Sequence, residues 1–259
     1  MRKGLARLLA PALLLGAAAG STTLLHAQSV AASPVSTWYA GAAAADITAP
    51  RYNPADDARD FPLCNTTMFN GPRQFDFEEP YIDQAATGRY QYPDPFCDAN
   101  ANGRYDGMYD SGGVDQLMTW VQSDIYARAV AISDGTHVAV IESITSQGLG
   151  YTDTIRIRNG ISGYSNAGGH GTVDAVLVSS DHNESSPDPI GIYGAPADPT
   201  GTVGARSGID DYYITFLVNQ AIAAGKQAVD GLTPARMRLG AFTPADVRAR
   251  LSTTFLTTD

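Results

Sequence analysis

The sequence predicts an α/β domain built on a mixed β-sheet with flanking helices. Two apolar, β-branched runs at residues 125–132 and 137–141 predict paired strands, and a third run at residues 173–178 predicts a buried strand. Helical patterns precede and follow that third strand, and strands alternating with helices are typical of an α/β domain. A long irregular segment, residues 50–118, stands before the paired strands as an N-terminal insertion.

The first residues predict an export signal. Arg2, Lys3 and Arg7 precede an apolar run at residues 5–19, and small residues follow, so we expect a signal peptide over residues 1–27 with cleavage as late as residue 32. The apolar run is too short and too rich in alanine for a membrane span. We therefore expect an exported protein, periplasmic or extracellular, that is not an integral membrane protein.

The net charge of the chain limits the kinds of partner that it can bind. The chain has 27 acidic and 17 basic residues and a formal net charge of −10. Nucleic acid is an unsuitable partner for such a chain, because its binding depends on neutralising phosphates. An acidic surface suits cation binding. The residues after the signal, 38–259, suffice for one domain with its own core, whose oligomeric state the sequence leaves open.

Residues 38–48 predict the first strand, which ends at Ala49-Pro50. The irregular segment that follows is rich in Pro, Asp, Asn, Gly and Tyr, and such a long segment is usually functional or cross-linked. Its two cysteines, Cys64 and Cys97, predict a disulfide in an oxidising compartment. A pair of metal-ligating thiolates is the weaker alternative, because Cys-x-x-Cys spacing is absent. Five tyrosines are expected to pack over this segment: Tyr81, Tyr90, Tyr92, Tyr105 and Tyr109.

The paired strands are joined by Asp134-Gly135, which is a strong hairpin signal. A weaker helical pattern covers residues 152–161, ahead of the buried strand.

The clearest helical pattern begins near Ser207, where Ser207 and Asp210 fit an N-terminal capping pattern. Thr233-Pro234 is expected to end this helix, and residues 237–242 are expected to form a last strand.

A polar segment, Ser179 to Asp188, follows the buried strand. Ligands in α/β sheets tend to bind beyond the carboxyl ends of strands. Imidazole and carboxylate groups are zinc ligands, so His182 is a predicted zinc ligand, and Glu184 is a second ligand, a group that orients the site, or a general base. The alternative is a loop histidine bonded to nearby Asp and Ser groups, which a lone His-x-Glu pattern favours.

A second candidate lies in the irregular segment. Asp98, Asn100, Asn102 and Asp106 occupy positions 1, 3, 5 and 9 of a calcium-loop pattern, with Gly103 at position 6. The twelfth position holds a tyrosine in place of a bidentate glutamate, and no amphipathic helices flank the loop. We expect a structural calcium ion here. The alternative is a network of Asx turns without an ion.

Residues 181–194, read Asp-His-Asn-Glu-Ser-Ser-Pro-Asp and then Pro-Ile-Gly-Ile-Tyr-Gly, resemble a motif of the neutral/alkaline, non-lysosomal ceramidases. That motif is roughly Thr-His-x-His-x-Gly-Pro-Asp, followed by an apolar-Gly-apolar-aromatic-Gly run. Three other segments are similar to ceramidase segments in the same order along the chain: residues 41–50, residues 124–135 and residues 208–238. The resemblance therefore covers most of the chain and the N-terminal part of the family.

The resemblance implies hydrolysis of the amide bond of ceramide at one zinc ion. The first motif His, a zinc ligand, falls on His182, and the second falls on Glu184. The motif's Thr falls on Asp181, which could bond the far nitrogen of a ligating His. The family completes its site with a further His, a Glu and a Tyr, and uses a catalytic Ser, all downstream. This chain ends at Asp259, before those segments are expected, so the resemblance implies an incomplete or truncated ceramidase-like domain.

The leading hypothesis is an exported, ceramidase-like, metal-dependent amide hydrolase domain for N-acylsphingosine-type lipids, with Glu184 as the catalytic base. A calcium-stabilised, non-catalytic binding or structural domain is one alternative, and an inactive truncated fragment is another. The sequence has no Gly-x-Ser-x-Gly elbow, so an α/β-hydrolase triad is not supported.

Overall fold

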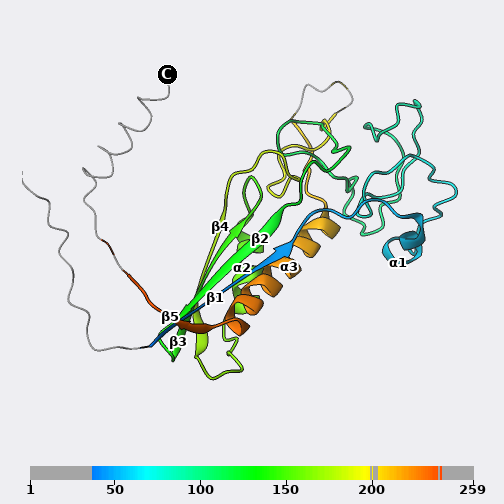
Figure 1. Cartoon of the computed structure of the whole chain (residues 1–259). Coiled ribbons are helices and arrows are strands. Elements are labelled where there is room, and N and C mark those ends of the chain that lie inside the picture. The colour runs from blue at the N-terminus through cyan, green and yellow to red at the C-terminus, as the bar shows by residue number, and fades with distance from the viewer. Residues whose placement is uncertain (1–36, 199, 201–203, 239, 241–259) are drawn as a thin grey trace, which may run out of the picture. The chain divides into compact units, whose positions relative to one another are not determined.

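The structure, a computed structural model, describes residues 37–198, 200, 204–238 and 240, and the described residues up to Met237 belong to one compact unit. Its strands form a five-stranded mixed sheet in the order β4-β3-β2-β1-β5 (Figure 1). The predicted α/β fold class is confirmed. The strands are β1 (Trp38–Asp46), β2 (Tyr126–Ser133), β3 (His137–Ile144), β4 (Thr172–Ser180) and β5 (Thr233–Ala235). The predicted signal peptide, residues 1–27 or as far as 32, lies outside the described residues.

A hairpin joins β2 to β3, as the Asp-Gly pair predicts. Asp134 Oδ1 accepts hydrogen bonds from the backbone N–H groups of Thr136 and His137, at 2.9 and 2.8 Å. Gly135 has a φ of +95°, a left-handed conformation that suits glycine because it has no Cβ. The two strands therefore pair antiparallel with little chain between them.

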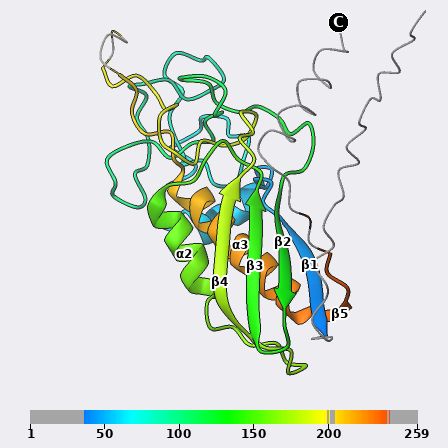
Figure 2. The same cartoon turned by 90° about the vertical axis from the view of Figure 1, so that its left-hand side faces the viewer.

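A helix, α2 (Tyr151–Ile161), carries the chain from β3 to β4, which pair in parallel. Parallel strands need such a crossover. Their carboxyl ends consequently lie side by side, at Ile144 and Ser180 (Figure 2). This pairing places the segments that follow β3 and β4 next to each other, at the end of the sheet where both strands finish.

The longest helix, α3 (Asp211–Asp230), packs against β1 and β2. Its N-cap is Asp210, whose Oδ1 accepts a hydrogen bond from the Tyr213 N–H at 2.8 Å, so the helix begins slightly after the predicted start near Ser207. Close packing depends on Gly41 in β1, since a Cβ there would lie 2.1 Å from the carbonyl oxygen of Ala228. The sheet therefore meets α3 almost backbone to backbone at this point.

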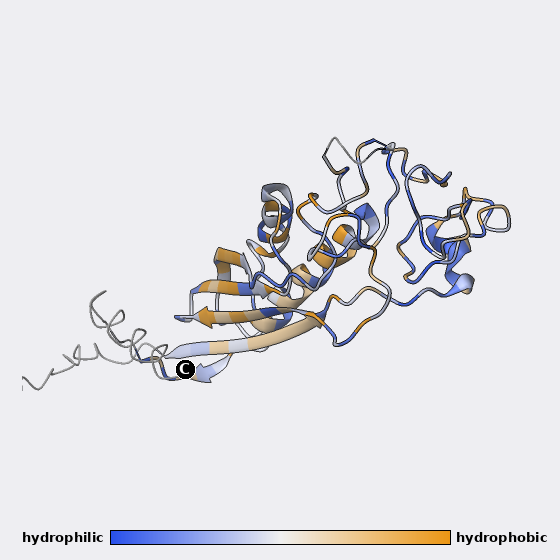
Figure 3. Ribbon diagram, turned by 90° about the horizontal axis from the view of Figure 1, so that it is seen from above, coloured by the Kyte–Doolittle hydropathy of each residue, from blue (hydrophilic) through white to orange (hydrophobic). Residues whose placement is uncertain are grey.

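The core lies between the sheet and the two helices. Alternate residues of β2 and β3 point inward, and many of them are alanine or valine, which lets the helices come close. Each large aliphatic side chain buried there, such as Leu217, contributes on the order of 2 kcal/mol. Figure 3 shows apolar residues concentrated along the strands and helices and polar residues prominent in the loops.

The predicted last strand is wrong in position. The strand is Thr233–Ala235, which includes Pro234, and it pairs with β1 at the edge of the sheet. Proline is tolerated there because an edge strand has one side without a pairing partner. Of the predicted range 237–242, Met237, Arg238 and Gly240 are not in a strand, and residues 239, 241 and 242 lie outside the described residues.

The long irregular segment is confirmed. Its described regular elements are a 3₁₀ turn, η1 (Pro54–Asp56), and a single turn of helix, α1 (Asp57–Asp60). The predicted disulfide joins Cys64 to Cys97, with the Cα atoms 6.0 Å apart. An aromatic cluster packs nearby, in which the rings of Tyr90 and Tyr105 stack with centroids 3.8 Å apart. The buried members of this cluster are Tyr81, Tyr90, Tyr105, Tyr109 and Ala195, with Tyr92 partly buried against them.

Several carboxyl groups are buried in this acidic chain. Glu142 of β3 points into the core, and neither of its carboxyl oxygens has a hydrogen-bond partner among the described residues. Burial raises the pKa of Glu142 to about 8. In the described part of the chain, no helix combines the length and the apolar character needed to cross a bilayer.

Glu142 should make stability depend on pH. Its folded pKa is about 8 and its ordinary value is 4.5, so between these values the folded state holds a proton that the unfolded state has lost. Stability therefore falls as pH rises through this window, by on the order of 2–4 kcal/mol for this one group. Urea unfolding of the wild type and of Glu142→Gln at pH 5 and pH 8 measures it. The wild type should lose stability relative to the variant over this range, whereas parallel pH profiles would contradict the assignment.

Candidate functional site

The polar loop after β4 is joined to the chain after β3 by backbone contacts. The Asp181 N–H donates to the carbonyl of Ile144 at 3.1 Å, and the Asn183 N–H donates to the carbonyl of Ser146 at 3.1 Å. Asp181 Oδ1 accepts a hydrogen bond from the Ser146 N–H at 3.2 Å. These contacts continue the parallel pairing beyond the ends of both strands and fix the loop at the sheet edge.

His182 has a left-handed backbone, with a φ of +63°. Such a conformation costs a non-glycine residue about 1–2 kcal/mol, and strained residues of this kind cluster at functional sites. The turn brings its Nε2 to 3.4 Å from Glu184 Oε1. Both side chains are exposed, at 72% and 59%, so the pair is open to a ligand and contributes little to stability.

Gln147 is a site residue that the sequence reasoning missed. Its Nε2 donates to Glu184 Oε1 at 3.4 Å and to the hydroxyl oxygen of Tyr193, while its Oε1 is buried without a hydrogen-bond partner among the described residues. Gln147 follows β3, and β3 pairs in parallel with β4. Polar residues that follow the two strands therefore meet. A predicted parallel pairing of these strands would have been the sequence signal that identified Gln147.

Asp188 organises the rest of the loop. Its carboxylate accepts three backbone hydrogen bonds, from Ile190 at 3.0 Å, Gly191 at 2.8 Å and Tyr193 at 2.9 Å. The side chain is buried, and Gly191 has a φ of +82°. The Ile-Gly-Ile-Tyr run is thus wrapped around one carboxylate, which places the Tyr193 hydroxyl beside Gln147.

The irregular segment supports the same loop from the other side. The Ser111 N–H donates to the carbonyl of Ser186 at 2.9 Å, and the Asp188 N–H donates to the carbonyl of Tyr109 at 2.8 Å. Tyr109 belongs to the buried aromatic cluster. The cluster therefore holds the loop as well as the irregular segment itself.

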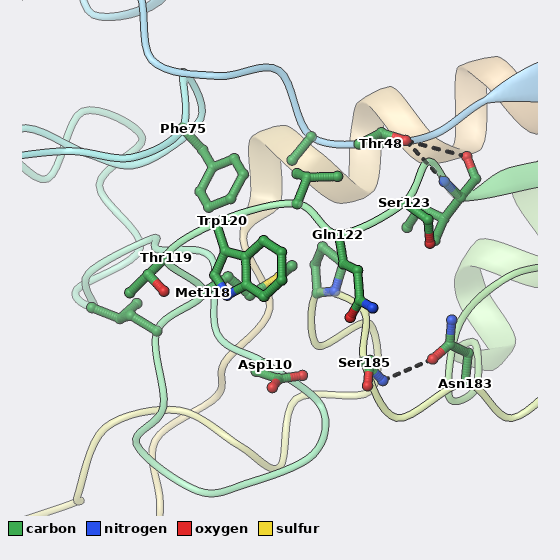
Figure 4. A pocket seen from close by; sticks show the side chains of 15 residues that line it. Thr48, Phe75, Asp110, Met118, Thr119, Trp120, Gln122, Ser123, Asn183 and Ser185 are labelled. Atoms are coloured by element: carbon green, nitrogen blue, oxygen red, sulfur yellow. Dashed lines mark hydrogen bonds between the residues drawn. The ribbon is translucent and has the colours of Figure 1, made fainter.

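A cleft of about 310 Å³ lies beside the loop (Figure 4). Trp120, which is 61% exposed, stands over it, and its other apolar walls include Phe75 and Met118. From the polar loop, the alternate residues Asn183, Ser185 and Pro187 line the cleft, whereas His182 and Glu184 do not. The remaining lining residues are Thr48, Ala49, Asp110, Leu117, Thr119, Val121, Gln122, Ser123 and Ile125.

The described residues do not make a complete zinc site. His182 and Glu184 are two donors side by side, and a protein zinc site uses three or four. No group of three or more His, Cys, Asp or Glu residues that could hold a metal occurs within the described ranges. The metal roles of His182 and Glu184 therefore stay predictions.

The structure brings only some of the predicted calcium ligands into contact with one another. Asp106 Oδ2 accepts hydrogen bonds from the amide nitrogens of Asn100 at 2.6 Å and Asn102 at 2.8 Å. Asp98 instead closes the loop, since its oxygens accept the N–H groups of Asn102 and Gly103, both at 2.9 Å. Burial raises the pKa of Asp106 to about 6, although Arg104 lowers it. Calcium binding itself stays a prediction.

No protein-family model matches this sequence, and no curated protein matches it. The solved structures that match this chain include two ceramidases. A neutral ceramidase from Pseudomonas aeruginosa is 12% identical, with a TM-score of 0.41, over 76% of this chain and 22% of that one. A ceramidase complexed with C2 is 13% identical, with a TM-score of 0.39, over the same shares of the two chains. This chain thus spans about a fifth of the length of those ceramidases.

Removing the Asp188 carboxylate should loosen the loop. Asp188→Ala leaves three part-buried N–H groups without their acceptor, so we expect a loss on the order of 1–3 kcal/mol in the free energy of unfolding. Hydrogen exchange at Ile190, Gly191 and Tyr193 should become faster by more than the global loss explains. Asp124→Ala, an exposed carboxylate outside the loop, is the control. Unchanged protection at the three amides would contradict the role given to Asp188.

Proposed function

We propose that this chain is a ceramidase-like, metal-dependent amide hydrolase part that acts on lipid amides of the N-acylsphingosine type. In this proposal His182 is a ligand of a zinc site that groups outside the described residues complete, and Glu184 is the carboxylate beside it that serves as general base or as a second ligand. The observation that carries the proposal is the exposed His182–Glu184 pair, 3.4 Å apart, on a strained turn at the carboxyl end of β4. The ceramidase-like motif at residues 181–194 supports the same reading.

The strain at His182 supports a functional role. An exposed His–Glu pair stabilises a fold very little, so stability gives no reason to keep a left-handed histidine there. Backbone contacts from Ser146 and Ile144 hold the turn on both sides of it. The fold therefore holds the backbone from which these two exposed donor side chains project.

Glu184 is the candidate base within this chain. Its carboxylate is exposed, and the Gln147 amide donates to one of its oxygens at 3.4 Å. A general base must lie within hydrogen-bond reach of the proton that it accepts, and an exposed, oriented carboxylate can meet a water molecule in that way. We therefore assign Glu184 to proton transfer and His182 to metal binding.

The cleft suits an apolar chain. Its volume of about 310 Å³ is at the lower end of the range for small-molecule sites, about 300–1,000 Å³. Apolar side chains, Phe75, Met118 and Trp120, form part of its walls, uncharged polar side chains such as Gln122 form much of the rest, and Asp110 is its single carboxylate. We propose that it holds one acyl or alkyl chain of the lipid, with the polar head of the lipid toward the polar loop after β4.

The disulfide indicates in which compartment the protein works. Cys64 and Cys97 pair in the structure, and stable disulfides are typical of exported proteins. We propose that the protein works outside the cytoplasm. The competing function is a non-catalytic binding domain, which the shortage of metal donors among the described residues favours.

Zinc titration tests the metal assignment. Structural zinc sites bind with about 10–16 kcal/mol, and two ligands should supply about half of that, so we expect a Kd of about 1–100 µM. His182→Ala should abolish this binding in calorimetry at pH 7.5. His137→Ala is the matched control, because His137 is also exposed and paired with a carboxylate, Asp174. Equal zinc binding by wild type and His182→Ala would rule out His182 as the ligand.

Fatty-acid release from a labelled ceramide tests the activity. We expect no turnover from the 259-residue chain alone and turnover once the downstream ceramidase zinc-ligand segments are supplied in cis. Glu184→Gln should then slow hydrolysis by about 10²–10⁴-fold with zinc retained. Trp120→Ala should raise KM, whereas Trp38→Ala on β1 should not. Robust turnover by the 259-residue chain would show that its metal ligands lie elsewhere.

A further inference from the structure

A second concentration of charge lies where residues 98–106 meet the first turn of α3, and the proposed hydrolase site does not use it. Asp106 is fully buried and Asp210 is 2% exposed, while the Asp211 side chain is 46% exposed. The backbone N–H of Asp211 points at Asp106 Oδ1, at 3.4 Å. Segments about a hundred residues apart in sequence thus bring three carboxyl groups to one place.

One of these groups is incompletely bonded. Asp210 Oδ1 accepts the Tyr213 N–H as the helix cap, but Asp210 Oδ2 is buried with no hydrogen-bond partner among the described residues. Asp106 is near enough for its charge to act on Asp210. A buried, unpaired carboxylate oxygen beside a second carboxylate calls for a positive charge or a donor.

The chain supplies one positive charge to this place. Arg104 Nη1 lies 2.6 Å from Asp106 Oδ1, and its Nη2 lies 2.8 Å from Asp211 Oδ1. Arg104 Nη1 also donates to the carbonyl of Ile209. One guanidinium is therefore shared by two carboxylates, and it does not satisfy Asp210 Oδ2. With the guanidinium placed between Asp106 and Asp211, no group of three or more His, Cys, Asp or Glu that could hold a metal occurs among the described residues.

Two amides face the same carboxylates. Asn100 and Asn102 both direct Nδ2 at Asp106 Oδ2, and Asn102 Nδ2 also lies 2.9 Å from Asp211 Oδ2. A half-turn of an amide exchanges its nitrogen and its oxygen. Here it would also break two bonds, because Asn100 Oδ1 accepts the Asn102 N–H at 3.2 Å and Asn102 Oδ1 accepts the Arg104 N–H at 2.9 Å. Turned in this way, the two amides would present carbonyl oxygens where they now present N–H donors.

We propose that residues 100–106 and the N-terminal turn of α3 form a calcium site, with oxygen ligands from Asn100, Asn102, Asp106, Asp210 and Asp211, in which the ion displaces Arg104. Carboxylate and amide oxygens in irregular geometry suit calcium, which takes six to eight oxygen ligands, waters included. Magnesium requires near-octahedral geometry and fits less well. The site differs from the loop predicted from sequence, because Asp98 is bonded to backbone N–H groups and α3 supplies the missing ligands.

Such a site would link the irregular segment to the longest helix, α3.

The experiment is calcium calorimetry and thermal melting of the EDTA-treated, disulfide-intact protein. We expect the wild type to bind calcium and Tm to rise with calcium up to 5 mM. Asp211→Asn should weaken binding at least tenfold. Asp153→Asn is the matched control, because Asp153 also lies in a first helical turn and pairs with an arginine, Arg156, at 3.0 Å. It should bind calcium as the wild type does.

The Arg104→Gln variant tests whether Arg104 competes with calcium for these carboxylates or only stabilises the fold. If the guanidinium competes with calcium, this variant should bind calcium more tightly than the wild type, and calcium should restore any Tm it has lost. Absence of a calcium effect on both wild type and Arg104→Gln would overturn the proposal and leave Arg104 as the sole counter-ion. An equal response to magnesium would overturn the assignment to calcium.

Discussion

The parallel pairing of β3 with β4 is the constraint on which the polar site depends. Ile144 pairs with Ser180 at the ends of the two strands, and the contacts of Ser146 with Asp181 and Asn183 extend that pairing into the loops. A slip of one residue would turn every side chain of β4 to the opposite face of the sheet. The apolar residues that β4 buries under the helices therefore also determine where the following polar loop lies.

The irregular segment is the second support of the site. Ordering such a long segment costs conformational entropy at every residue. The Cys64–Cys97 disulfide and the buried aromatic cluster offset that cost. From the cluster, Tyr109 reaches the polar loop through a backbone hydrogen bond to Asp188. The segment thus acts as a wall for the cleft and as a brace for the loop, in place of regular secondary structure.

Buried carboxyl groups are the feature that most distinguishes this unit from a simple α/β core. Glu78, Glu79, Glu142 and Asp210 all have their pKa raised by burial, and Glu142 has no hydrogen-bond partner for its carboxyl group among the described residues. Burial therefore favours the uncharged, protonated form of each of these groups over its charged form. A nearby positive charge opposes this effect by stabilising the ionised form, as Arg104 does at Asp106.

The sequence by itself determined the elements that follow from local chemistry. The Asp134-Gly135 hairpin, the long helix and the strand before the polar loop were all predicted, although that helix begins at Asp211 and not near Ser207, because periodicity and turns are set by near neighbours in the chain. The disulfide was predicted because the chain has one pair of cysteines. His182 and Glu184 were singled out for the same kind of reason, since they directly follow a recognisable strand.

The tertiary structure alone decided the rest. Pro234 within a strand depends on its place at the sheet edge, and the contact of Gln147 with Glu184 depends on the pairing of β3 with β4. The cleft beside Trp120 joins four separate stretches of chain, residues 48–49, 75, 110–125 and 183–187, and the meeting of Asn102 with Asp211 joins residues 109 positions apart. No local pattern encodes such contacts, because they form only when the whole core packs and brings distant segments together.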